Sequence, residues 1–456
     1  MSLFEIPSSD IRFLVTNMIR YFLTFSTTIA ILALGNSLDA FQATETQDRE
    51  MLQQKAVNLK SFEKIWKTIR DRHWDEELVG ESWDKHREEL LPKIETAAST
   101  NEARDVMNEL ISRLEQSHFG LIPASSYDAI GGEGSGGGNC DIGITARLIE
   151  GDLVVTQLRA NGPAAKAGVK PGWTITKIRG KSSGDLIERF KNAAHGPQRF
   201  ETIVGLATWR MMSDQKNKPI KIEFTDGTNQ SRALKLKCTL PKGKMASLGN
   251  LPPMRVVDES KTLSGNIGYY HFNAFLDPLR IMPSYRKAIR SKSHSRGLVL
   301  DLRGNFGGIV TMTMGMAGEF VSKPTKLGTM TMKGSEINLI ANPTPHPVSV
   351  PVAVLIDECS ISAAEFLAGG LQDNKLARVF GQRTAGLALP SVIEKLPNGD
   401  GFQYAIADYH SASGKTLEMK GVVPDEKVEV RKQDLIQGND PVLQAALRWI
   451  NQENSK

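Results

Sequence analysis

From Ser264 onward, short apolar runs alternate with segments of helical periodicity, and this alternation constrains the fold more than any other feature. The runs lie at 266–275, 297–302, 350–356 and 377–380, and helical segments follow Gly308 and Ser362. Strands that helices cover on both faces are almost continuously apolar, whereas strands with one face in water alternate. Residues 241–456 therefore predict an α/β core with a buried, partly parallel sheet.

The chain is too long for one ordinary domain. It has 456 residues, of which 40% are hydrophobic and 23% charged, which is typical of a globular protein. The net charge is +5, and the charges are mixed along the chain without a dense Lys/Arg run. We therefore expect a mixed solvated surface and no nucleic-acid partner.

The N-terminal segment has the features of an export signal. Residues 21–35 are apolar or small and uncharged, Arg20 precedes them, and small residues up to Ala40 offer a cleavage point. The apolar stretch is shorter than the about 20 residues of a membrane span. Residues 1–40 predict a signal peptide and an exported, periplasmic or extracellular protein. The alternatives are a start at Met18 and an uncleaved segment that would contact the membrane.

Two stretches follow the signal. Residues 44–123 predict a helical domain, because apolar residues such as Phe62, Ile65 and Ile69 recur at helical spacing. The glycine-rich stretch 124–139 contains a formal GxGxxG, but a strand-like segment follows it instead of the helix that a dinucleotide site needs, so we interpret it as a linker. No motif predicts a cofactor or a metal site.

Residues 140–240 read as short strands and turns. The stretches Gly162-Pro-Ala-Ala-Lys-Ala-Gly168 and Pro171-Gly-Trp173 resemble the PDZ domains of bacterial proteases. That resemblance implies that Gly143 and Ile144 lie in the loop that receives a peptide carboxylate. Cys140 and Cys238 lie near the two ends of this domain; a disulfide and a pair of buried free thiols both fit.

Two segments of the core carry candidate chemistry. In Gly297-Leu-Val-Leu-Asp-Leu-Arg-Gly-Asn-Phe-Gly-Gly308 an apolar strand leads into a glycine-rich turn, whose backbone N–H groups can approach a developing oxyanion. In Ser362-Ala-Ala-Glu365 a serine opens a helix. This is a formal capping box, and taken alone it favours a cap over a nucleophile.

Together these motifs resemble the carboxyl-terminal processing peptidases, the family of the tail-specific proteases and the tricorn core. GLVLDLRGNFGG, SISAAEFLAGGLQDNKLARVFGQRTAGL and MKGVVPDEKV occur in the family's order. The resemblance implies a crotonase/ClpP-like α/β protease core with an N-terminal helical domain and an inserted PDZ-like β-domain. It places the nucleophile at Ser362 and an oxyanion hole at the N–H of Ala363 with that of Gly307 or Gly308.

The general base does not follow from the closer-looking branch of the family. Where that branch has a lysine, this chain has Leu387, which cannot move a proton. The stretch from Leu114 to Pro123 resembles the tricorn-like branch instead, which implies His118 as the base, Ser117 beside it, and Glu418 as the acid. An imidazole with a pKa of about 6.5 is suited to this role at neutral pH.

The resemblance thus implies an exported serine endopeptidase that cleaves peptide bonds through an acyl-enzyme. Its partners would be polypeptide substrates, with C-terminal peptides bound at the PDZ-like domain, and it could form a homo-oligomer. The alternative is a catalytically inactive relative that binds peptides or hydrophobic ligands, which the missing lysine favours if His118 lies far from Ser362.

Overall fold

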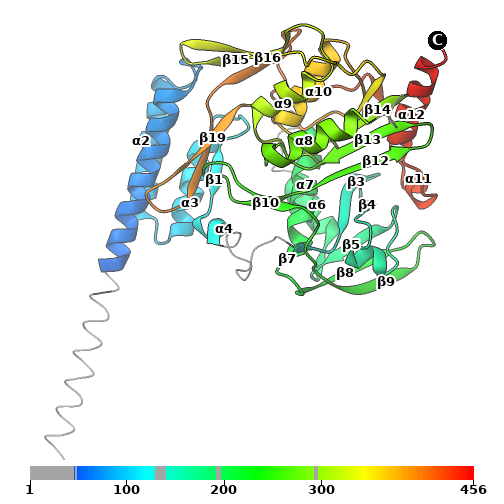
Figure 1. Ribbon diagram of the computed structural model, residues 1–456. Helices are drawn as coiled ribbons and strands as arrows, with labels where there is room; N and C mark the ends of the chain where they lie inside the picture. The colour runs from blue at the N-terminus through cyan, green and yellow to red at the C-terminus, as the bar shows by residue number, and fades with distance from the viewer. Residues whose placement is uncertain (1–45, 47–48, 129–139, 192–196, 292–295) are drawn as a thin grey trace, which may run out of the picture.

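The computed structural model describes residues 46, 49–128, 140–191, 197–291 and 296–456. In this part of the chain we distinguish a helical region, a β-region at residues 140–240 and an α/β core (Figure 1). We call the β-region the PDZ-like region, after the sequence resemblance that predicts it. The predicted signal peptide, residues 1–40, lies outside the described residues. Among the helices that are described, none is both long and apolar enough to cross a membrane.

The core is built on a six-stranded sheet with the order β12-β13-β14-β17-β18-β22. The strands from β13 to β22 run parallel, and β12 is antiparallel to β13. The strands are β12 (Asp258–Leu263), β13 (Ile267–Phe272), β14 (Gly297–Asp301), β17 (Val352–Ile356), β18 (Arg378–Gly381) and β22 (Glu426–Lys427). This confirms the α/β core that the sequence predicts.

Helices cover both faces of this sheet. Leu298, Leu300 and Val354 belong to the hydrophobic cluster formed with α8 (Pro278–Ile289), α9 (Val310–Ala317) and α10 (Ala363–Asp373). Val299 and Leu355 belong to the cluster formed with α12 (Pro441–Glu453). Strands β14 and β17 are consequently buried at every position, which accounts for their nearly unbroken apolar sequence.

Smaller elements complete the core. The hairpin of β15 (Thr325–Met332) and β16 (Ser335–Ala341) pairs with β21 (Asp408–Ser411), and β10 (Lys244–Ala246) pairs with β11 (Met254–Val256). The short helix α11 (Lys432–Ile436) precedes α12.

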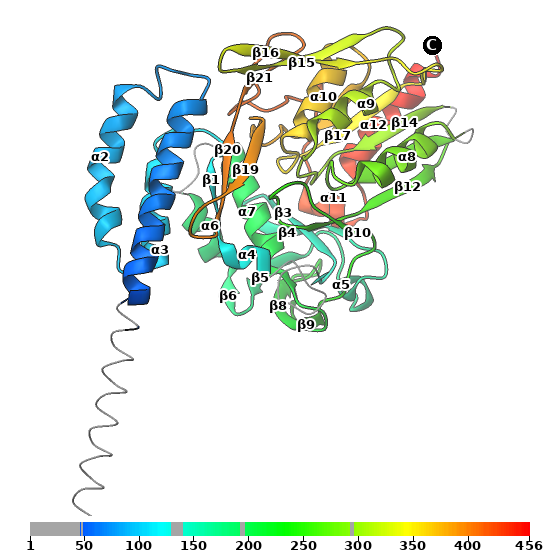
Figure 2. The ribbon, with the colours of Figure 1, turned by 60° about the vertical axis from the view of Figure 1, so that its left-hand side comes forward.

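The helical region is completed by strands from the core's part of the sequence. A helix over residues 49–72 packs with α2 (Glu81–Thr96) and α3 (Thr100–Ser112). A three-stranded sheet of β1 (Gly120–Ile122), β20 (Gly401–Ala405) and β19 (Ser391–Lys395) lies between these helices and the core (Figure 2). Phe402 and Tyr404 of β20 enter the hydrophobic cluster of the helices. The predicted boundaries of this domain therefore missed β19 and β20.

The predicted linker 124–139 also begins differently from the prediction. Its first residues form the short helix α4 (Ala124–Asp128), and residues 129–139 lie outside the described chain. The N–H of Ala124 donates to the Asp400 carboxylate at 2.8 Å, and Arg104 of α3 binds the same carboxylate through two bonds of 2.8 Å. Asp400 is fully buried, so this ion pair ties the helices to β20.

The PDZ-like region contains a sheet in which β3, β4, β5, β8 and β9 follow one another and β6 pairs with β5. Its elements are β2 (Cys140–Asp141), β3 (Ile144–Ile149), β4 (Asp152–Leu158), α5 (Pro163–Lys166), β5 (Thr174–Ile178), β6 (Lys181–Ser182), α6 (Ser183–Lys191), α7 (Pro197–Met211), β7 (Ser213–Asp214), β8 (Pro219–Thr225) and β9 (Ser231–Lys237). Cys140 and Cys238 are buried free thiols, so the second of the two alternatives holds.

The sequence interpretation of this region as strands and turns missed α6 and α7. Helix α7 carries the β-branched run Thr202-Ile-Val204 followed by Gly205, and both residue types have low helix propensity. The helix forms nevertheless, because it packs along β3 and buries Val204 in the core of the region.

We predict that Arg104→Ala destabilises the helical region. The substitution leaves the buried Asp400 carboxylate without its cationic partner, which costs on the order of 3 kcal/mol. Urea unfolding followed by tryptophan fluorescence measures the change. Lys93→Ala, which removes an exposed pair with Glu109, is the matched control and changes stability by less than about 1 kcal/mol. Equal effects of the two substitutions would contradict the prediction.

Candidate active site

Ser362 lies in a strained turn where the segment after β17 enters α10. Its backbone has φ 57° and ψ −117°. A non-glycine residue held in such a sparsely populated conformation costs about 1–3 kcal/mol. The residue is half-buried, and its hydroxyl makes no cap hydrogen bond to the helix. The hydroxyl is therefore not committed to the capping role that the sequence favoured for this segment taken alone.

The buried carboxylate of Glu365 holds this turn in place through hydrogen bonds. It accepts the N–H of Ser362 at 2.9 Å, the N–H of Leu387 at 3.1 Å, the N–H of Gly386 at 2.9 Å and the hydroxyl of Thr384 at 2.6 Å. Burial raises the pKa of Glu365 to about 7, although these four donors favour its ionised form. Glu365 thus joins the nucleophile turn to the segment that follows β18.

Ser117, His118 and Glu418 form one hydrogen-bonded group. The Ser117 oxygen lies 2.8 Å from His118 Nδ1, and its hydroxyl donates to Glu418 Oε2 at 2.8 Å. The N–H of Ser117 donates to Glu418 Oε1 at 2.7 Å. Ser117 is buried and His118 is half-buried, with φ 59°. The histidine region and the acid therefore meet although 301 residues separate Ser117 from Glu418.

A single peptide unit links this group to the nucleophile. The carbonyl of Leu387 accepts the N–H of Ser362 at 3.0 Å, and the N–H of the next residue, Ala388, donates to Glu418 Oε2 at 2.9 Å. The segment that has Leu387 in place of the family's lysine thus binds, through its backbone, both the nucleophile turn and the group of Ser117, His118 and Glu418. The structure brings Ser362 and Glu418 to this one peptide unit, and Ser117 is bound to Glu418.

Gly307 contacts the nucleophile turn directly. It has φ 76°, and a Cβ added to it would lie 2.8 Å from Ser362 Cβ and 2.8 Å from the carbonyl oxygen of Ile361. Only glycine therefore fits here. Its N–H, however, already donates to Asn305 Oδ1 at 2.9 Å, so this donor is occupied.

The N–H groups of Gly308 and Ala363 are better placed as oxyanion donors. The carbonyl of Gly307 accepts the N–H of Phe275 at 2.7 Å, and because the two ends of a trans peptide point in opposite directions, the N–H of Gly308 points away from Phe275. Ala363 is the first residue of α10, where N–H groups have no partner within the helix. Within the described residues neither N–H makes a hydrogen bond, which narrows the predicted choice between the two glycines to Gly308.

The other polar groups of this loop are structural. The Ser360 hydroxyl is buried and donates to the carbonyl of Leu302 at 2.8 Å. Cys359 is buried, and burial raises the pKa of its thiol far above the usual range. Within the part of the chain that the structure describes, no group of three or more His, Cys, Asp or Glu side chains is arranged to hold a metal ion.

Gly143 and Ile144 lie apart from Ser362, at the start of β3 in the PDZ-like region. Gly143 has φ 77°, which suits a tight loop. Its N–H donates to the Asp141 carboxylate at 2.8 Å. The predicted carboxylate loop is therefore present as a turn, with one of its donors already bound to an acidic side chain.

Comparisons with known proteins find related proteases. Residues 266–428 match the model of peptidase family S41, and residues 56–112 match the tricorn protease C1 domain. The chain is 24% identical to the chloroplastic C-terminal processing peptidase of Tetradesmus obliquus over 387 residues, 81% of this chain and 76% of that protein. It is 24% identical to the carboxyl-terminal-processing protease of a Synechocystis species over 405 residues, 88% and 85% of the two chains.

Solved structures establish the same fold. The photosystem II D1 C-terminal processing protease superposes with a TM-score of 0.56 at 21% identity, covering 86% of this chain and 96% of that one. Mature CPAF superposes with a TM-score of 0.57 at 14% identity, covering 87% and 96%. The family matches and the named relatives support a serine peptidase. Residues 266–428 form a peptidase family S41 domain, residues 56–112 a tricorn C1 domain, and the relatives are named carboxyl-terminal processing proteases.

We predict that Gly307→Val lowers peptidase activity by at least about 10²-fold. The side chain would meet Ser362 Cβ and the Ile361 carbonyl, so the nucleophile turn has to move. A displacement of about 1 Å at the reacting group costs roughly 10²-fold in rate. Hydrolysis of a fluorescent casein measures the loss. Gly334→Val, at an open hairpin turn, is the control for a valine at positive φ. Full activity of Gly307→Val would contradict the packing described above.

We further predict that Glu365→Gln lowers kcat about 10²-fold in a folded protein. A glutamine amide offers one acceptor oxygen, so some of the four donors to Glu365 lose their acceptor and the turn is released. The rate of fluorophosphonate labelling follows the same change at the nucleophile itself. Glu88→Gln, at an exposed site on α2, leaves both rates unchanged. Equal labelling of the two variants would exclude the positioning role.

Proposed function

We propose that this chain is an exported serine endopeptidase that cleaves polypeptides through an acyl-enzyme on Ser362, with His118 as the general base. The observation that carries the proposal is the bridge of residues 387–388. It binds the Ser362 backbone on one side and, on the other, the Glu418 carboxylate that holds Ser117 and thereby His118.

The hydrogen bonds of Ser117 support one tautomer of His118. A serine hydroxyl has one hydrogen, and Ser117 donates it to Glu418. Its oxygen can therefore only accept from His118, so Nδ1 carries the proton and Nε2 keeps the lone pair that a base needs. When Nε2 takes a second proton, the positive charge is stabilised through Ser117 by the carboxylate of Glu418. Ser117 and Glu418 thus orient the base.

In the proposed reaction, Ser362 Oγ transfers its proton to His118 Nε2 and attacks the substrate carbonyl carbon. The N–H groups of Gly308 and Ala363 bind the oxyanion of the tetrahedral intermediate. The C–N bond then breaks, the amine leaves with the proton from His118, and the acyl group stays on Ser362. A water molecule, activated by the same histidine, hydrolyses this ester and restores the enzyme.

Export and the choice of substrate belong to the same proposal. The sequence of residues 1–40 supports export, and the names of the relatives support action on the C-terminal regions of proteins. A homo-oligomeric state would be compatible with this function, and no part of the proposed reaction depends on it.

We predict that Ser362→Ala and His118→Ala each lower peptidase activity about 10⁶-fold, because the two groups act as one unit. Ser117→Ala lowers it by roughly 10², since His118 loses its tautomer and orientation. Casein hydrolysis by purified protein measures all three. His410→Ala, a half-exposed histidine elsewhere in the core, is the control and keeps full activity.

Turnover that survives in Ser362→Ala would refute the nucleophile, and turnover that survives in His118→Ala would refute the base. A wild-type protein that neither cleaves casein nor reacts with a fluorophosphonate would favour the alternative of a peptide-binding relative without activity.

A further inference from the structure

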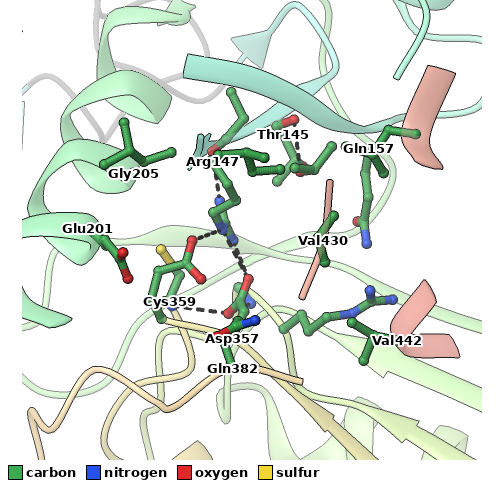
Figure 3. A pocket seen from close by; sticks show the side chains of 18 of the residues that line it. Thr145, Arg147, Gln157, Glu201, Gly205, Asp357, Cys359, Gln382, Val430 and Val442 are labelled. Atoms are coloured by element: carbon green, nitrogen blue, oxygen red, sulfur yellow. Dashed lines mark hydrogen bonds and ion pairs between the residues drawn. The ribbon is translucent and has the colours of Figure 1, made fainter. Parts of the chain in front are cut away.

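A cavity of about 700 Å³ lies between the PDZ-like region and the core, apart from Ser362. Strand β3 lines one side, helix α7 a second, and the loop from Asp357 to Cys359 a third (Figure 3). Ligand pockets in proteins have volumes of about 300–1,000 Å³. The cavity is therefore large enough for several residues of a bound chain.

One wall of the cavity is an open strand edge. Strand β3 is the end strand of its sheet and pairs only with β4. The N–H of Arg159 donates to the carbonyl of Gly143, and in an antiparallel ladder this pattern turns the N–H of Ile144 away from β4. All residues from Ile144 to Ile149 line the cavity. An extended peptide can pair with such an edge through its main chain.

The end of the β3 edge near Gly143 does not favour binding of a peptide's C-terminal carboxylate. Asp141 places its own carboxylate there, accepting the N–H of Gly143 at 2.8 Å and pairing with Arg159 at 2.9 Å. An incoming carboxylate would meet an occupied donor and a like charge. The expectation that Gly143 binds a peptide C-terminus is thus replaced by one in which the edge accepts an internal segment.

The interior of the cavity carries an excess of negative charge. Asp357 and Glu358 share one guanidinium, that of Arg147, which lies 2.9 Å from Asp357 and 3.2 Å from Glu358, and Glu201 adds a third carboxylate to the lining. Asp357 is further satisfied by the N–H groups of Gly304 and Cys359. Glu201 points into the cavity and, within the described residues, makes neither a hydrogen bond nor an ion pair (Figure 3).

The remaining basic residues of the lining do not balance this charge. Arg303 is bound to Asp301 and Asp440, and Lys427 and Arg431 are solvent-exposed. Lys427 lowers the pKa of Glu201 through its charge, but burial has the larger effect. Burial raises the pKa of Glu201 and raises that of Glu358 to about 7, as expected for carboxylates with too few cationic partners. A further cation would therefore be stabilised inside the cavity.

The same wall offers an aromatic surface for such a cation. Trp209 of α7 is 44% exposed and lines the cavity, with its ring 5.8 Å from that of Phe306. Indole is the side chain that binds ammonium and guanidinium groups best through its ring face. It also covers the apolar stem of a lysine or arginine side chain.

Strand addition to β3 is the binding mode that the PDZ resemblance implies. We propose that an internal segment of a polypeptide binds here, and that Glu201 and Glu358 select it by binding a lysine or arginine side chain of that segment. The inference deepens the proposed function and rests on it in one respect, namely that the bound segment is taken to be part of the substrate. Binding itself requires no turnover.

The test uses the full chain with Ser362→Ala, so that cleavage does not interfere. Three fluorescein-labelled decapeptides of alternating valine and threonine carry a central lysine, norleucine or glutamate, and each is made with an amidated and a free C-terminus. Fluorescence anisotropy gives Kd. The lysine peptide binds about tenfold more tightly than the norleucine peptide, the glutamate peptide binds most weakly, and amidation changes nothing. The preference for lysine shrinks as the salt concentration rises.

Variants locate the site. Glu201→Gln, at a half-buried position, removes most of the preference for lysine, and Glu201→Lys reverses it in favour of glutamate. Glu358→Gln has the effect of Glu201→Gln, with thermal melting as the check of its fold. Glu188→Gln removes the same charge from the exposed face of α6 in the same region and leaves the preference unchanged.

Three results would overturn the proposal: equal affinity for lysine and norleucine, binding only of peptides with a free carboxylate, or an equal loss in Glu188→Gln. Because the measurement is made on a variant without the nucleophile, these results leave the proposed peptidase activity untouched. Conversely, an inactive wild-type chain would leave the binding result standing.

Discussion

The buried carboxylate of Glu365 holds the candidate active site together. It accepts four donors, one from the nucleophile turn and three from the segment after β18, in surroundings where water cannot replace them. Such a network over-determines the backbone around it, which is how a strained serine conformation persists in a folded protein. The position of Ser362 thus follows from a residue three positions along its own helix.

The second half of the site depends on contacts between regions of the chain. In a relative with lysine at the position of Leu387, the base would belong to the same core as the nucleophile. Here the proposed base comes from the end of the helical region, so its position depends on the sheet that β1 makes with β20 and on the Arg104–Asp400 pair. The packing of the helical region against the core therefore does more than stabilise the protein, because it also orients His118.

The sequence predicted those parts of the structure that local patterns determine. The apolar runs identified the strands of the core, and the order of the motifs pointed to Ser362 and Glu418, which the structure brings to one peptide unit, and to Ser117, which is bound to Glu418. Contacts between distant backbone groups, such as that of the Ser362 N–H with the carbonyl of Leu387, could not be predicted, because they depend on how separate segments pack. The use of the Gly307 N–H by Asn305, and of the Gly143 N–H by Asp141, is in each case a turn between residues two positions apart that the sequence interpretation did not include. Helix α7 was missed because packing against β3 overrides its low propensity.

The long separation of Ser117 from Glu418 has a consequence for the time at which the enzyme can act. During synthesis the proposed base emerges first, the nucleophile much later, and the acid last. A growing chain that ends before Glu418 has a serine at the head of its helix but no carboxylate to orient the histidine. If the proposed roles hold, a chain that ends before Glu418 would therefore have the nucleophile but not the complete catalytic group, so peptidase activity would require synthesis to proceed past Glu418.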